Sequence, residues 1–291
     1  MERVELAAGA ARATIDARGA EAARWSVAGT QLLWIKDPRV WDGVAPILFP
    51  VVGWTAGGRA RVAGKTYPLG LHGFARGMRF AATRLGPSRA RFALAAGEET
   101  RASYPFDFWL GVQYALFPTA LAVGLTVKNR GDAPMPYACG LHPGLRWPFA
   151  GGGQEDYAVE FAEEEDPRVP EISADGLFRA RRRAAPLEGR RLALTPDAFA
   201  AEALCFLNAR SRSLRFVGPR GAALKVETSN FNHVALWSRP GAPFLCVESW
   251  TGHGDPEGFR GDLYEKPSMR LLAPGAVAHH VARYSFSPAR G

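Results

Sequence analysis

The feature of this sequence that most limits its possible folds is a succession of short segments rich in β-branched and aromatic residues, each ended by Gly, Pro or Asp. Such runs are typical of β-strands joined by turns, whereas apolar residues at helical spacing are scarce. The alternation of strands with helices that builds parallel sheets is also missing. The sequence therefore predicts an all-β protein with few short helices, either two large packed antiparallel sheets or a barrel.

The predicted strands extend along nearly the whole chain. An early hairpin is expected from Ala22–Val27 and Gln31–Ile35, which flank the turn at Ala28–Thr30. One short helix is expected at Pro196–Ala203. The later strands are predicted at Met78–Arg84, Ala90–Ala95, Phe108–Leu116, Ala120–Lys128, Pro136–His142, Tyr157–Phe161, Ser213–Val217, Ala223–Thr228, His233–Ser238, Leu245–Trp250, Met269–Leu272 and His279–Tyr284.

The whole chain, residues 1–291, is predicted to form one domain with a loop-rich excursion around residues 151–191. That excursion contains three consecutive glycines, an acidic run, a basic run and three prolines. The segments on either side share one strand pattern, and no repeat of about 20 to 50 residues divides the chain. With 47% hydrophobic residues, the chain has enough apolar surface for a sizeable core.

Charge and cysteine content narrow the functional classes. The formal net charge is +8, but the arginines that supply it are scattered, and the densest run, Arg179–Arg183, follows the acidic run Glu163–Asp166. A scattered surplus is typical of a solvated surface, so no nucleic-acid partner is expected.

Cys139, Cys205 and Cys246 are too widely spaced for a disulfide framework or a zinc site and are predicted to be buried apolar residues.

Neither a membrane nor a metal is expected as a partner. No apolar stretch reaches the ~18 residues of a membrane helix, and the N-terminus lacks the regions of a signal peptide. The protein is therefore expected in the cytoplasm, as a monomer or homodimer.

His233 and His253 lack metal-ligand spacing, and the adjacent His279 and His280 point to opposite faces of a strand. The glycine clusters lack the context of a phosphate or dinucleotide loop, so no cofactor is expected.

The sharpest candidate for chemistry is Glu248, which interrupts the apolar segment Phe244–Trp250. A carboxylate in an apolar strand is either paired or placed there to react, and burial raises its pKa toward neutrality, where it can act as a base. Pairing with one of the many arginines is the structural alternative.

Two histidines are further candidates. His142 stands at the end of a predicted strand before Pro143, which favours presentation of its ring to a cleft; the alternative is a half-buried histidine bonded to a carbonyl. His72 precedes Gly73, which allows a ligand to approach closely, and Arg76 is a permanent cation that can bind sugar hydroxyls or a phosphate. A surface loop with a capping histidine is the alternative there.

Taken in order, these segments resemble the aldose 1-epimerase (mutarotase) family, and in particular its LacX-like branch. The similar segments are Trp41–Gly53, Gly64–Leu69, His72–Arg76, Lys128–Asp132, Met135–Tyr137, Gly140–Pro143, Leu194–Phe199, Leu236–Ser238 and Val247–Trp250. Each is weakly specific alone, whereas their collinear order is specific. The resemblance implies a galactose mutarotase-like β-supersandwich that interconverts the α and β anomers of a sugar without metal or cofactor.

The same resemblance implies roles for the candidate residues. Glu248 is expected to be the general base that takes the proton from the C1 hydroxyl. His142 is expected to be the general acid that protonates the ring oxygen, and His72 to orient the sugar. Tryptophan faces stack on sugar rings, although a tryptophan is also a common core residue. The other expected binding residues are Arg76, Trp237, Trp250 and Asp255.

Two departures from the family pattern bear on the substrate. Relatives that act on hexose 6-phosphates usually carry Arg-Gly-Gly where this chain has Trp41-Asp42-Gly43, which argues against a phosphosugar, although Arg76 remains. Many members have Pro where this chain has Ser249, a change expected to affect how rigidly Glu248 is held. The alternatives to a mutarotase are a carbohydrate-binding or sensing protein that keeps the cleft without turnover, a hexose-6-phosphate mutarotase, and a polyanion-binding surface protein, which the scattered charge disfavours.

Overall fold

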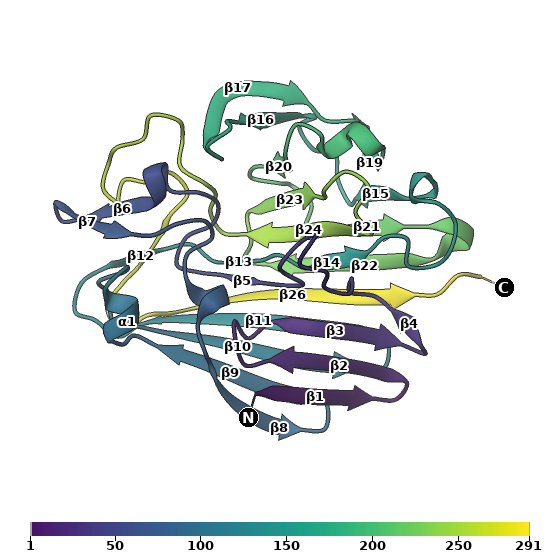
Figure 1. Ribbon diagram of the computed structural model, residues 1–291, viewed down its shortest axis with the longest axis horizontal. Coiled ribbons are helices and arrows are strands. Elements are labelled where there is room, and N and C mark those ends of the chain that lie inside the picture. Colours follow the sequence, from purple (N-terminus) through teal and green to yellow (C-terminus); the bar gives the residue numbers. More distant parts are fainter. Residues whose placement is uncertain (1, 291) are drawn as a thin grey trace.

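The computed structural model describes residues 2–290 and consists mainly of antiparallel strands (Figure 1), which confirms the predicted all-β class. Helical structure in these residues is limited to α1 (Glu98–Arg101) and single 3-10 turns. These turns are η1 (Ala56–Gly58), η2 (Ala75–Gly77), η3 (Gln154–Asp156), η4 (Pro196–Phe199) and η5 (Pro219–Gly221). No helix among the described residues has both the length and the apolar character that crossing a membrane requires.

The largest layer is a ten-stranded sheet in the order β18-β19-β15-β21-β22-β26-β11-β10-β9-β8. Its strands are β8 (Ala81–Gly86), β9 (Arg89–Ala95), β10 (Phe108–Phe117), β11 (Ala120–Asn129), β15 (Ala158–Phe161), β18 (Leu187–Glu188), β19 (Arg191–Ala193), β21 (Ser213–Val217), β22 (Ala223–Ser229) and β26 (Val277–Ser287). In β9, Ala90, Phe92 and Leu94 are buried, while Arg89 and Arg91 between them are exposed. This two-residue alternation places one face of the sheet against the core.

Two smaller sheets cover the apolar face of the large one. The N-terminal sheet consists of β1 (Arg3–Ala8), β2 (Ala11–Asp16), β3 (Ala22–Val27) and β4 (Thr30–Gln31). It lies over β9 and β10, with β1 touching both strands (Figure 1), and the Tyr114 hydroxyl donates a hydrogen bond to the Ala20 carbonyl at 2.7 Å. The predicted early hairpin is present as β3 and β4, although β4 is shorter than expected.

The other covering sheet has six strands and carries the candidate site. Its order is β20-β23-β24-β13-β5, with β14 also paired to β24. The strands are β5 (Ile47–Leu48), β13 (Gly140–Leu141), β14 (Gly144–Arg146), β20 (Leu204–Phe206), β23 (His233–Trp237) and β24 (Phe244–Trp250). Every residue of β24 is buried, and the Phe206 ring of β20 packs on the Phe161 ring of β15 at 4.9 Å between centroids. One face of this sheet therefore joins the core, and the other is free to form a site.

Three further strand pairs lie at the edges. They are β6 (Arg59–Val62) with β7 (Lys65–Pro68), β12 (Met135–Tyr137) with β25 (Arg270–Leu272), and β16 (Arg168–Ile172) with β17 (Phe178–Ala184). The excursion at 151–191 is thus richer in strands than expected: it contains β15, β18 and the β16–β17 hairpin, and β19 begins at its end. After Phe178, β17 carries mostly exposed arginines, so its sequence lacks the apolar alternation of a strand. The helix expected at Pro196–Ala203 is the single 3-10 turn η4.

Candidate active site

A cleft of about 1110 Å³ opens beside the six-stranded sheet. Side chains alternate along a strand, so Glu248 and Trp250 of β24 point to the same side, and both line the cleft. Trp237 of the neighbouring β23 lines it as well. The sequence pattern that made Glu248 conspicuous, a carboxylate among apolar residues, therefore corresponds to a strand whose alternate residues form the floor of a cleft.

Glu248 and His142 are in direct contact on this floor. The His142 Nε2 atom lies 3.3 Å from Glu248 Oε2, and both side chains are buried. The same carboxylate oxygen accepts a hydrogen bond from Trp250 Nε1 at 3.0 Å. His142 follows directly after β13, as predicted for a residue at a strand end. No arginine pairs with Glu248 among residues 2–290, so the structural alternative of an Arg–Glu pair does not apply.

Burial shapes the protonation of this pair. It raises the pKa of Glu248 well above the ordinary carboxyl value, against a smaller opposing effect of the Trp250 hydrogen bond. It lowers the pKa of His142 to about 3. Because an isolated charge on either group is costly in this environment, the two side chains together hold one proton and carry no net charge. The pair therefore contains one proton donor and one proton acceptor at neutral pH.

Three aromatic rings fix the orientation of His142. The Trp41 ring stacks on the imidazole at 5.1 Å between centroids, with an interplanar angle of 29°. Trp237 and His72 contact it edge to face, at 5.8 and 5.4 Å. The Nδ1 atom of His142 is buried and has no hydrogen-bond partner among the described residues. The Nε2 atom is therefore the nitrogen placed to exchange a proton.

His72 is held by its own backbone region. The Gly53 N–H donates a hydrogen bond to His72 Nδ1 at 3.1 Å, so the neutral ring carries its proton on Nε2. Burial lowers the pKa of His72 well below its ordinary value, and the nearby His142 and Arg76 lower it further. His72 lines the cleft, and no hydrogen bond joins its Nε2 to another of residues 2–290. This N–H can therefore be donated to a ligand.

Gly73 has a different function from the one expected. Its φ of +70° and its packing both require glycine, because a Cβ at this position would lie 2.3 Å from the Phe49 carbonyl oxygen. The missing side chain makes room for the backbone of the Phe49 segment, whose carbonyl accepts hydrogen bonds from the N–H groups of Phe74 and Ala75. Gly73 does not line the cleft, so it serves to seat the loop that carries His72.

Of the other predicted binding residues, the structure brings all but one to the cleft. Arg76, Trp237 and Trp250 line it. Asp255 does not: its carboxylate accepts a hydrogen bond from the Ala56 N–H at 2.8 Å and pairs with the buried Lys266. A buried ammonium requires a counter-ion, so Asp255 is engaged in a structural ion pair away from the cleft, and this structure gives no support to the expectation that it binds sugar.

The cleft also has walls that sequence patterns did not predict as part of a site. The turn of the β16–β17 hairpin and the segment 200–203 line the cleft, so the excursion contributes to its wall. Cys205 lies on the floor, and all three cysteines are buried, as predicted. Trp41 was part of a family-like segment and one of several tryptophans with a ring surface suited to a sugar, but it was not among the predicted site residues. Among residues 2–290, no cluster of His, Cys, Asp or Glu is arranged to hold a metal ion.

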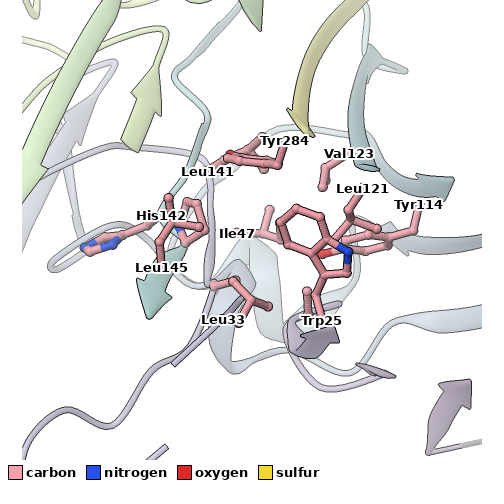
Figure 2. Close-up of a pocket in the computed structure, with 13 residues that line it drawn as sticks. Trp25, Leu33, Ile47, Tyr114, Leu121, Val123, Leu141, His142, Leu145 and Tyr284 are labelled. Atoms are coloured by element: carbon pink, nitrogen blue, oxygen red, sulfur yellow. The ribbon is translucent and has the colours of Figure 1, made fainter. Parts of the chain in front are cut away.

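A second cavity lies on the other side of His142, between the N-terminal sheet and the ten-stranded sheet (Figure 2). It measures about 20 Å³ and is lined almost entirely by apolar side chains, among them Trp25, Leu121 and Val123. That volume accommodates no more than about one water molecule. The 1110 Å³ cleft is therefore the candidate site for an organic substrate.

Comparisons of sequence and structure identify proteins that are similar to this chain. The sequence profile of the Aldose 1-epimerase family matches residues 2–191. The LacX protein of Lactococcus lactis is 30% identical over 257 residues, which are 84% of this chain and 86% of that protein. A galactose mutarotase-like protein from Lactobacillus casei superposes with a TM-score of 0.91 at 28% identity, covering 98% of this chain and 100% of the other. Galactose 1-epimerase from Lactobacillus acidophilus shares the fold, with a TM-score of 0.69 at 13% identity over 99% of this chain and 95% of the other.

Proposed function

This chain belongs to the aldose 1-epimerase family, and from that premise we propose that it is a mutarotase, which interconverts the α and β anomers of an aldose by acid–base ring opening and reclosure. The observation that carries the proposal is the contact of Glu248 and His142 on the floor of the cleft, with 3.3 Å between Oε2 and Nε2. Mutarotation needs one proton removed and one delivered over a short distance. A buried pair that holds one proton meets this need.

In the proposed reaction, Glu248 is the base and His142 the acid. Transfer of the shared proton from Oε2 to Nε2 creates the carboxylate and the imidazolium. The carboxylate takes the proton from the C1 hydroxyl, and the O1 electrons form the aldehyde C=O as the C1–O5 bond breaks. His142 protonates O5, which receives the electrons of that bond. Rotation about C1–C2 and the reverse transfers close the ring as the other anomer, and each group contributes about 10²- to 10⁴-fold.

The surrounding residues support this assignment of atoms. Glu248 Oε2 is engaged by His142 and Trp250, while no hydrogen bond to Oε1 occurs among residues 2–290, so Oε1 is free for the C1 hydroxyl. The His72 Nε2–H is available to a sugar oxygen. Trp237 and Trp250 present ring surfaces to the cleft, and such surfaces suit the apolar face of a sugar ring.

The experiment that tests the proposal is measurement of anomeric exchange by NMR for glucose, galactose and several less common aldoses. We expect acceleration over the buffer rate, and loss of most of it in Glu248→Gln and His142→Asn. Glu227→Gln and His279→Asn make the same chemical changes outside the cleft, at a half-exposed and an exposed position, and serve as matched controls. Circular dichroism and thermal unfolding establish that each variant is folded.

A non-catalytic carbohydrate-binding or sensing protein predicts a different result. It would bind a sugar, seen as line broadening or chemical-shift changes of the sugar signals, and would accelerate exchange of none. Retention of full activity in both Glu248→Gln and His142→Asn would exclude the acid–base assignment.

A further inference from the structure

A second carboxylate lines the cleft and has no part in the proposed proton transfers. Glu21 lies between the turn that follows β2 and Ala22, the first residue of β3. These two neighbours face opposite sides, because Ala22 lines the small apolar cavity whereas Glu21 lines the cleft. Glu21 therefore contributes a titratable group to the space in which the sugar is proposed to bind.

One oxygen of the Glu21 carboxylate is fixed by the backbone. Its Oε1 accepts hydrogen bonds from the N–H groups of Val44 and Ala45, at 2.7 and 2.9 Å. Hydrogen bonds to an ionised acceptor are among the stronger ones in proteins, and two donors on one atom restrict how the planar carboxylate can turn. The position of Oε2 is thereby restricted as well.

The other oxygen has no partner. Glu21 Oε2 accepts no hydrogen bond from residues 2–290 and is not sealed off from solvent. The nearby Lys36 is paired with Asp42 at 2.7 Å. Burial raises the pKa of Glu21, and Asp16 adds to the rise, whereas the two N–H groups and Lys36 oppose it. The carboxylate thus has fewer donors than it would have in water, and one more donor at Oε2 would stabilise it.

The segment that fixes Glu21 is also bonded to the residues around His142. The Gly144 N–H donates to the Val44 carbonyl at 2.7 Å. The His142 N–H donates to the Pro46 carbonyl at 3.2 Å. Glu21 and the proposed acid are therefore attached to one hydrogen-bonded segment, and this shared support fixes their positions in the cleft relative to one another.

We propose that Glu21 is a substrate-binding residue, whose Oε2 accepts a hydrogen bond from a hydroxyl group of the sugar other than the one on C1. A carboxylate oxygen is only an acceptor, so it selects a group that has a proton to donate. A site built to bond a substrate hydroxyl discriminates strongly against an analogue that lacks it. Glu21 thus helps to determine which aldoses are accepted. The identity of the ligand as an aldose rests on the proposed mutarotase function.

The substitution Glu21→Gln separates sugar binding from support of the backbone. The N–H groups of Val44 and Ala45 can be accepted only by the oxygen of the introduced amide, so its NH2 group takes the place of Oε2. That NH2 group is only a donor and cannot accept a hydrogen bond from the sugar hydroxyl. Both backbone hydrogen bonds remain, so we expect the variant to fold, and thermal unfolding checks this.

Binding is measured by isothermal titration in the Glu248→Gln background, which keeps the cleft but lacks the proposed base. The ligands are glucose, galactose and their monodeoxy analogues. We expect Glu21→Gln to weaken binding of the preferred sugar about 10- to 100-fold, the range expected for a hydrogen bond to a charged group. One monodeoxy analogue should bind equally with and without Glu21→Gln, and it identifies the hydroxyl that Oε2 accepts.

Glu165→Gln is the matched control for this substitution. The Glu165 carboxylate is buried and accepts hydrogen bonds from the N–H groups of Arg210 and Ser211, but it does not line the cleft. Unchanged affinity in Glu21→Gln would overturn the binding role. So would a loss shared with Glu165→Gln, or an equal loss for the parent sugar and every analogue.

Exchange measurements on the otherwise wild-type chain distinguish this inference from the proposed function. Turnover with an unchanged KM in Glu21→Gln would refute the binding role alone. Binding that depends on Glu21, of an aldose that is not turned over, would refute the mutarotase function and leave the binding role standing. Failure of every aldose to bind would overturn both.

Discussion

Replacement of Trp250 by Phe tests whether the indole N–H tunes the proposed base. The substitution keeps an aromatic ring in the cleft and removes the 3.0 Å hydrogen bond to Glu248 Oε2. A hydrogen bond to an ionised group contributes about 1.5–3 kcal/mol, and one between neutral groups about 0.5–1.5 kcal/mol. Loss of the donor therefore disfavours the carboxylate relative to the acid by about 1–1.5 kcal/mol, which raises the pKa of Glu248 by about one unit.

The expected kinetic result follows from the shared proton. The reaction requires the carboxylate–imidazolium form, and a higher Glu248 pKa shifts the pair toward the neutral acid and neutral imidazole. We expect kcat/KM for the preferred sugar to fall about tenfold on its pH plateau. The alkaline limb should move to higher pH by up to about one unit, because the proton of the pair is lost less readily.

The assay is NMR exchange spectroscopy as a function of pH, corrected for the folded fraction. Trp25→Phe is the matched control: Trp25 is also a buried tryptophan, but its Nε1 has no hydrogen-bond partner among the described residues. Any effect shared by the two variants reflects the lost volume of the indole. The reasoning is refuted if Trp250→Phe matches Trp25→Phe on the plateau, or if its alkaline limb moves to lower pH.

Three further predictions concern pH and stability. Burial lowers the pKa of His142 to about 3, so the acid limb of kcat/KM should lie well below the ordinary histidine pKa of about 6.5, and a limb at that value would contradict the shared-proton pair. Asp255→Asn leaves the buried Lys266 without its counter-ion and should lower the free energy of unfolding by about 3–5 kcal/mol in urea titrations; a loss below about 1 kcal/mol would show that the pair is dispensable. Burial lowers the pKa of His280 to about 4, so this group stays neutral in the fold at pH values where the unfolded chain binds a proton, and its contribution to stability should fall between about pH 6.5 and 4 by up to about 1.4 kcal/mol per pH unit. His280→Gln should reduce the slope of stability against pH in urea titrations across this range, and an unchanged slope would assign the acid sensitivity to other groups.

Local patterns in the sequence were sufficient to predict most strands. Ser213–Val217 was predicted with the bounds that β21 has, and the strand around Glu248 differs from β24 by one residue. Other strands were not predicted. They include β1 and β2, whose side chains do alternate between exposed and buried positions, and several strands without visible alternation between apolar and polar residues. The β16–β17 hairpin is the clearest case, since an arginine-rich strand whose side chains face solvent has no apolar face to reveal it.

The candidate site shows a similar division. Glu248 and His142 could be singled out from the sequence alone, because a polar group inside an apolar segment is energetically costly to bury and is therefore conspicuous. Their contact and the Trp41 ring stacked on His142 link residues far apart in sequence. Neither of these could be read from spacing along the chain.

The sequence by itself determined the all-β class, because alternation along a strand is a local property of the chain. Only the tertiary structure decided what each polar group pairs with. Asp255 illustrates the difference. Its carboxylate pairs with Lys266 and accepts a hydrogen bond from the Ala56 N–H, whereas the carboxylate of Glu248 contacts His142 and lines the cleft. The physical reason is that the free energy of a buried charge depends on the atoms that surround it in space, and long-range packing of the sheets chooses those atoms.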